Sequence, residues 1–243
     1  MKRWLLIVLS ALSAVKCLPQ NMLSDKREGF DLLSASIVID PNDDSLIHIA
    51  ARLFQKDIEM VSGYTPSIVT TALTKKIILI GNINNSRLIK ELIKDRKLNV
   101  SKLKDQWEGY QIQVIKKPFK DIEEALVIAG SDRRGTAYGV FELSKQIGVS
   151  PWYWWADVPV KKKNEIYIDK NISLSDAPKV KYRGIFINDE APALSNWSKE
   201  KFGGFNHQFY EKVFELILRL KANYLWPAMW GNAFYDDDLS NKQ

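Results

Sequence analysis

The chain has 243 residues, of which 46% are hydrophobic and 26% charged, and its formal net charge is +6. This composition is typical of a soluble globular protein, and the length allows one complete domain and the start of a second. The basic residues are spread along the chain, and the densest run, Lys161–Lys163, has no interleaved aromatic residues, which argues against a nucleic-acid partner.

The N-terminus resembles an export signal. The positively charged residues Lys2 and Arg3 come first, the apolar stretch Trp4–Leu12 follows, and the small residues Ser13 and Ala14 come after it. We expect residues 1–17 to be removed and the product to be secreted or periplasmic. The apolar stretch is too short to span a bilayer, and no other segment has the length and apolarity of a membrane span. The single cysteine, Cys17, lies at the end of this leader, so no intramolecular disulfide is expected.

Strands and helices alternate between residues 30 and 150. Short apolar or alternating runs predict strands at residues 36–40, 76–80, 110–115 and 125–129. Apolar residues at helical spacing predict helices at residues 46–58, 88–94 and 132–147, and glycines follow the first and the last. This order predicts a small N-terminal α/β domain with a mixed sheet.

Residues 151–178 form an aromatic-rich linker between this domain and the next. Trp152–Trp155 are four consecutive aromatic residues, which cannot all face one core. Some therefore line a cleft, where rings suit the apolar face of a sugar, or pack between domains, and the pattern leaves both alternatives open. The substrate-binding candidates here are Trp154, Trp155 and Asp157.

Residues 179–243 read as the start of a second domain. An apolar strand at 179–188 precedes a helix with Asn206 as N-cap and a Phe205–Tyr210 hydrophobic staple, and a further strand is expected at 222–229. Strands of this kind, apolar on both faces, are typical of a parallel sheet. The pattern therefore predicts one βαβ unit.

Polar and aromatic residues follow both strands of this unit. In a β/α barrel, that rim builds the active site. Adjacent carboxylates there suit acid–base chemistry or hydroxyl recognition, although they could also simply begin a solvated loop. The catalytic candidates are Asp189 and Glu190, and the substrate-binding candidates are Asn188, Trp226, Trp230 and Asn232.

Five segments resemble glycoside hydrolase family 115, the xylan α-1,2-glucuronidases: Gly130–Gly139, Ser150–Val158, Tyr182–Leu194, Lys201–Phe205 and Lys221–Phe234. The resemblance implies a small α/β domain followed by a (β/α)8 barrel of the TIM type, here truncated after its first strands. It also implies inverting removal of glucuronic acid or 4-O-methylglucuronic acid from glucuronoxylan or its oligosaccharides, and leaves a homodimer of the full-length enzyme open. Because the family continues beyond the position of Gln243, we expect an N-terminal fragment that is inactive alone and labile after about Asp176.

An inverting glycosidase needs an acid and a base with carboxyl groups about 6.5–9.5 Å apart. Asp189 and Glu190 are adjacent, so they are poor candidates for the whole pair. We expect Asp189 to act as base or hydroxyl ligand and the partner acid to lie beyond residue 243.

The uronate carboxylate needs a cationic group. Arg133 and Arg134 open a helix, where an anion is favoured, and arginine binds carboxylates bidentately. The alternative is a surface arginine pair on a helix that Gly135 and Gly139 allow to pack closely. The two histidines, His48 and His207, are isolated, so we expect no metal and no cofactor.

Two other functions remain open at this level. The first is another barrel glycosidase with a similar small N-terminal domain, such as a hexosaminidase-like enzyme, which would need no carboxylate-binding arginine in its sugar pocket. The second is a non-catalytic secreted carbohydrate-binding module, which would retain polysaccharide without hydrolysing it.

Overall fold

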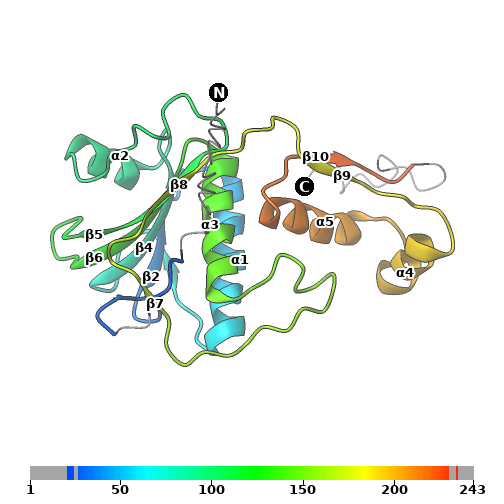
Figure 1. Ribbon diagram of the computed structural model, residues 1–243, viewed down its shortest axis with the longest axis horizontal. Coiled ribbons are helices and arrows are strands. Elements are labelled where there is room, and N and C mark those ends of the chain that lie inside the picture. Colours follow the sequence, from blue (N-terminus) through cyan, green and yellow to red (C-terminus); the bar gives the residue numbers. More distant parts are fainter. Residues whose placement is uncertain (1–20, 25–26, 230–233, 235–243) are drawn as a thin grey trace, which may run out of the picture.

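A computed structural model describes residues 21–24, 27–229 and 234 of the chain (Figure 1). The predicted leader, Trp230 and Asn232 lie outside the described residues. Figure 1 shows a larger unit, in which helices cover a central sheet, beside a smaller unit that spans residues 184–226. In the part of the chain that is described, no helix is long and apolar enough to cross a membrane.

The larger unit contains a six-stranded sheet in the order β3-β2-β4-β6-β5-β8. Strands β3, β2, β4 and β6 run parallel, whereas β5 is antiparallel to both of its neighbours. The predicted mixed sheet is therefore confirmed. The strand bounds are β2 Ser36–Ile39, β3 Ile68–Val69, β4 Lys76–Asn82, β5 Tyr110–Lys116, β6 Glu124–Gly130 and β8 Ser173–Asp176.

Helices cover both faces of this sheet. Helices α1 (Ser45–Ser62) and α3 (Arg133–Ile147) pack on one face, and α2 (Arg87–Lys94) packs on the other. The three predicted helices are thus confirmed. Close packing at Gly135 is confirmed as well, since a Cβ there would lie 2.2 Å from the Gly109 carbonyl oxygen.

The segment at residues 151–178 is more than a linker. Strand β7 (Tyr167–Ile168) pairs with β1 (Phe30–Asp31), and β8 adds an antiparallel edge to the main sheet. These strands are two and four residues long, and β8 has the half-polar sequence Ser-Leu-Ser-Asp. Such short runs carry too little periodicity to be recognised as strands before the sheet they join is known.

The smaller unit is built around a parallel pair, β9 (Gly184–Phe186) and β10 (Tyr224–Trp226), connected through α4 (Ala193–Phe202) and α5 (His207–Arg219). Both strands are shorter than predicted, and before β9 the Arg183 Nη1 donates to the Val180 carbonyl. Helix α4 was not expected, since its sequence has no clear apolar stripe.

Asn206 caps α5 as predicted, accepting from the backbone N–H groups of Gln208 and Phe209. The Phe205 ring packs on Phe209, with centroids 4.9 Å apart, rather than on Tyr210 as the staple pattern predicted. The Tyr210 hydroxyl instead accepts from the Ala228 N–H at 3.1 Å, which turns its ring into the core of the unit.

A buried ion pair joins the two units. Arg219 of α5 donates to both carboxylate oxygens of Asp57 in α1 at 2.8 Å, and its Nε donates to Glu215 at 2.9 Å. The guanidinium lies 4.7 Å from the ring centroid of Phe141 and 4.9 Å from that of Tyr153. The Arg219 and Asp57 side chains are 2% and 0% exposed, so this contact holds α5 against the first unit in a fixed position.

Candidate active site at the strand ends

The parallel pair has one covered face and one open face. Ile185 lies opposite Leu225, and both pack in the core cluster with α5. Phe186 lies opposite Trp226 on the other face, where the two side chains are 54% and 49% exposed. Their rings meet edge to face with centroids 5.8 Å apart. The open face is therefore aromatic at the carboxyl end of the strands.

The predicted polar residues continue directly from this end. The Ile187 N–H donates to the Trp226 carbonyl at 2.9 Å, which extends the pairing by one residue. Asn188 and Glu190 are exposed, and the Asn188 side chain accepts from the Glu190 N–H at 3.2 Å. Asp189 is only 4% exposed. The stretch therefore presents an amide and a carboxylate to solvent and holds a second carboxylate in a buried position.

Asp189 is held against the helices of the unit. The Ser195 hydroxyl at the start of α4 donates to the Asp189 carbonyl oxygen. Burial raises the pKa of Tyr210, and the negative charge of nearby Asp189 adds to this rise. Its backbone is anchored at a strand end and its carboxylate is buried, which suits a general base or a hydroxyl ligand, because either role requires a defined orientation.

The structure brings Asn188, Asp189, Glu190 and Trp226 to one end of the strand pair. Trp226 keeps half of its side chain exposed there, and its indole N–H lies 3.3 Å from the Met229 sulfur. Its exposed ring is available for stacking on a sugar.

Trp154 and Trp155 lie elsewhere, in an aromatic cluster with the helices of the smaller unit. Trp155 packs on Trp197 of α4 with centroids 5.6 Å apart, and its indole N–H donates to the Lys212 carbonyl at 3.2 Å. Trp154 packs edge-on against Trp155, with centroids 5.0 Å apart. This placement matches the packing alternative. Asp157 is exposed, follows the turn at residues 151–155 and has a φ of 50°.

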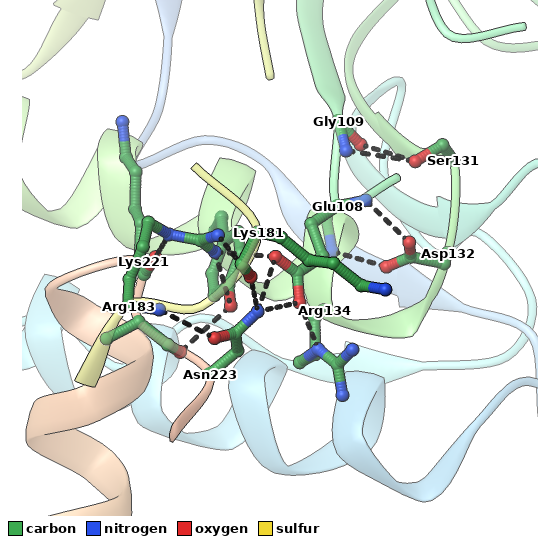
Figure 2. A network of polar contacts seen from close by, with 12 residues as sticks. Glu108, Gly109, Ser131, Asp132, Arg134, Lys181, Arg183, Lys221 and Asn223 are labelled. Atoms are coloured by element: carbon green, nitrogen blue, oxygen red, sulfur yellow. Dashed lines mark hydrogen bonds and ion pairs between the residues drawn. The ribbon is translucent and has the colours of Figure 1, made fainter. Parts of the chain in front are cut away.

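Arg133 and Arg134 lie near the opposite end of the strand pair. Arg133 is exposed. The Arg134 Nε lies 2.5 Å from Glu108 Oε1, and the other oxygen of Glu108 lies 2.5 Å from Nη2 of Arg183, the residue before β9 (Figure 2). The two arginines therefore do not join the residues at the carboxyl end.

The network around Glu108 was missed by reading the sequence. Arg183 and Asn223 lie in segments that were predicted as strands, without a role in a site. Glu108 lies in a loop before β5, where the sequence has no periodic pattern or motif. Their convergence depends on how the two units meet.

Among the described residues, no group of three or more histidine, cysteine, aspartate or glutamate side chains could hold a metal ion.

Comparison with sequence families gives two matches. The profile of glycosyl hydrolase family 115 matches residues 175–243, and that of the glycosyl hydrolase family 67 N-terminus matches residues 20–143. No curated protein sequence gave a significant match.

Among solved structures, the chain is similar to BtGH115A, a family 115 4-O-methyl-α-glucuronidase with specificity for decorated arabinogalactans. The TM-score is 0.74 and the identity 33%, over 86% of this chain and 27% of that enzyme. The chain thus spans about a quarter of that enzyme's length.

The β-hexosaminidase of Streptomyces plicatus gives a TM-score of 0.47 at 12% identity, over 81% of this chain and 30% of that enzyme. An exo-β-N-acetylglucosaminidase of Vibrio harveyi gives 0.45 at 14% identity, over 84% of this chain and 23% of that enzyme. Likeness at this level carries no functional argument.

Proposed function

Because this chain belongs to glycosyl hydrolase family 115, we propose that the whole protein removes glucuronic acid or its 4-O-methyl ether from a polysaccharide by hydrolysis. The observation that carries the proposal is the match to a 4-O-methyl-α-glucuronidase, which extends over 86% of this chain at 33% identity. The chain spans 27% of that enzyme, so the activity is assigned to the whole protein.

The strand pair supplies a place for this chemistry. We propose that β9 and β10 are the first strands of a (β/α)8 barrel, with α5 outside and the face of Phe186 and Trp226 inside. Two observations support this: the strands are parallel, and large aromatic side chains are exposed on the face that α5 does not cover. An exposed apolar patch of this kind marks a surface that other elements or a ligand cover.

In such a barrel, the carboxyl ends of the strands form the active-site rim. We assign Asp189 as general base or hydroxyl ligand, Asn188 and Glu190 as groups that contact sugar hydroxyls, and Trp226 as a stacking surface. Inversion requires an acid about 6.5–9.5 Å from the base, which another strand of the barrel supplies. Because Arg134 is engaged by Glu108 at the opposite end, we place the uronate-binding cation elsewhere in the whole protein.

We propose glucuronoxylan and its oligosaccharides as substrates, from the resemblance of five segments to xylan glucuronidases. Because BtGH115A is specific for decorated arabinogalactans, xylan and arabinogalactan backbones both have to be tested as substrates. Export through a leader at residues 1–17 fits an enzyme that meets polysaccharide outside the cytoplasm.

The test is uronic acid release by the purified whole protein. Glucuronoxylan, a glucuronate-decorated arabinogalactan and an aryl N-acetyl-β-hexosaminide are each incubated with it, and products are separated by anion-exchange chromatography. Carboxyl-reduced glucuronoxylan is the matched control and is expected to release no sugar. Hydrolysis of the hexosaminide alone, or polysaccharide retention without release, would overturn the proposal in favour of a hexosaminidase-like enzyme or a binding module.

A further inference from the structure

Glu108 is held firmly by the first unit. It lies two residues before β5 with a φ of 54°, in the left-handed region that a residue with a side chain rarely adopts. Its N–H donates to Asp132 Oδ2 at 2.6 Å, and the N–H of the following Gly109 donates to the Ser131 hydroxyl at 2.9 Å (Figure 2). These bonds fix the backbone, so the direction of the Glu108 side chain is set by the first unit.

The Glu108 carboxylate reaches across to the second unit. Its Oε2 lies 2.5 Å from Arg183 Nη2, and the Asn223 side-chain amide donates to both oxygens at 2.9 and 3.0 Å. The side chain is 2% exposed. Burial alone would raise the pKa of Glu108, but hydrogen bonds from Arg183, Asn223 and Arg134 outweigh it and hold the pKa below its usual value. The group is therefore a charged acceptor at neutral pH.

The two residues of the second unit that Glu108 binds, Arg183 and Asn223, also open the parallel pair. The Arg183 N–H donates to the Asn223 side-chain oxygen at 3.0 Å, and the Asn223 N–H donates to the Arg183 carbonyl at 2.8 Å. Gly184 and Tyr224 follow as the first paired residues. We call Glu108, Arg183 and Asn223 the strand clip.

A pair this short depends on such an anchor. Each strand has three residues, so only a few ladder bonds add to the packing of Ile185 and Leu225 in fixing the register. A slip by one residue would shift a strand by about 3.3 Å and turn its side chains to the other face. Asn188 and Asp189 follow β9 directly, so they would move with it.

We propose that Glu108 is a positioning residue for the active site: through the strand clip it sets the register of β9 on β10 and so places Asn188 and Asp189 at the other end. The proposal rests on the proposed function for the role of those two residues. The distance from Arg183 to Asp189 along an extended chain is at most about 20 Å, short enough for the strand to transmit a shift.

The competing explanation is that Glu108 only holds the two units together. Glu142 of α3 provides the matched control. Its carboxylate lies 2.7 Å from Lys221 Nζ, across the same junction, and it also accepts from Gln146, so its partners lie outside the strand pair. Glu108→Gln and Glu142→Gln each remove one buried negative charge without changing side-chain shape.

Hydrogen exchange in the whole protein separates these explanations. The probes are the Ile187, Asn223 and Tyr224 amides, which donate to carbonyls of the strand pair or the strand clip. We expect Glu108→Gln to speed their exchange by about tenfold or more, which is about 1.4 kcal/mol, and Glu142→Gln to leave the Ile187 amide within about twofold of wild type. Equal effects of both variants on Ile187 would overturn the proposal. If Glu108→Gln does not fold, Asn223→Ser breaks the strand clip from the other side and gives the same readout.

Kinetics of the whole enzyme give the second readout. We expect Glu108→Gln to lower kcat about tenfold or more with KM nearly unchanged, since a displacement of about 1 Å can cost a hundredfold. Glu108→Gln combined with Asn223→Asp exchanges donor and acceptor and is expected to restore part of kcat. A normal kcat in Glu108→Gln, or no recovery in the double variant, contradicts the proposal. If wild type releases no uronate at all, the proposed function fails, whereas exchange at Ile187 still decides whether the strand clip sets the register.

Discussion

Replacing Asp57 by alanine tests how the two units are joined. The change removes both carboxylate oxygens that Arg219 binds at 2.8 Å in a fully buried site. Removing one partner of a buried ion pair costs about 3–5 kcal/mol, because the other charge remains without compensation. Glu215 still accepts from Arg219 at 2.9 Å, so we expect the lower end, about 3 kcal/mol.

Urea unfolding followed by tryptophan fluorescence measures this loss, because Trp154, Trp155 and Trp197 pack together beside α5. With an m value of about 1–3 kcal/mol per M, the midpoint is expected to fall by about 1–3 M. The control is Asp57→Ala combined with Arg219→Met. Burial raises the pKa of Asp57 in spite of the hydrogen bonds from Arg219, so desolvation offsets much of the ionic attraction.

Removing both charges and filling the space with an apolar side chain is therefore expected to recover part of the loss, with Glu215 retaining Lys212 and Tyr153 as partners. The reasoning is refuted if the single variant loses less than about 1 kcal/mol, or if the double variant is no more stable than the single one.

Three further outcomes follow from local features. Asn206→Ala removes the cap of α5 and is expected to cost about 1 kcal/mol in urea unfolding followed by circular dichroism; an unchanged midpoint would contradict the capping role. Gly184→Ala would place a Cβ 2.1 Å from the Tyr224 carbonyl oxygen, so the Ile187 amide is expected to lose its protection in hydrogen exchange. Retained protection at Ile187 would show that the two strands can accommodate the added methyl group and stay paired. The pKa of Glu108 is lowered on folding, so its charge contributes fully to the free energy of unfolding above about pH 4.3, the pKa of an unperturbed glutamate. This contribution is lost as the pH falls through the lower pKa of the folded state. The difference in unfolding free energy between wild type and Glu108→Gln is thus expected to be larger at neutral pH than at about pH 3, and a pH-independent difference would argue against a charged Glu108.

The sequence was most informative where a pattern is local. Buried strands such as Lys76–Asn82 and capped helices such as Arg133–Ile147 carry their own periodicity and stop signals, and the structure has them within two residues of the predicted bounds. Asn206 was recognised as an N-cap for the same reason.

Features that depend on tertiary partners were not predictable. Strand β8 is polar and short, so only its pairing with β5 identifies it as part of the first unit. The aromatic run at Trp152–Trp155 allowed both stacking on sugar and packing, and contacts with α4 and α5 were needed to distinguish them for Trp154 and Trp155.

The candidate site shows the same division. Asn188, Asp189, Glu190 and Trp226 were placed at one strand end by the order of elements alone, and the structure brings them to that end. Arg134, however, binds Glu108, which is 26 residues earlier in the chain, and a contact of this range leaves no periodic signal.

The most direct test of the central claim is the activity of Asp189→Asn in the whole protein. The variant keeps side-chain shape and removes the charge, and Glu200→Gln on the exposed side of α4 serves as the control with equal charge change. We expect kcat/KM for uronic acid release to fall by about 10²–10⁴ in Asp189→Asn and to remain near wild type in Glu200→Gln, with both proteins folded. A folded Asp189→Asn enzyme within about threefold of wild type would contradict the assignment of the strand end as the active site.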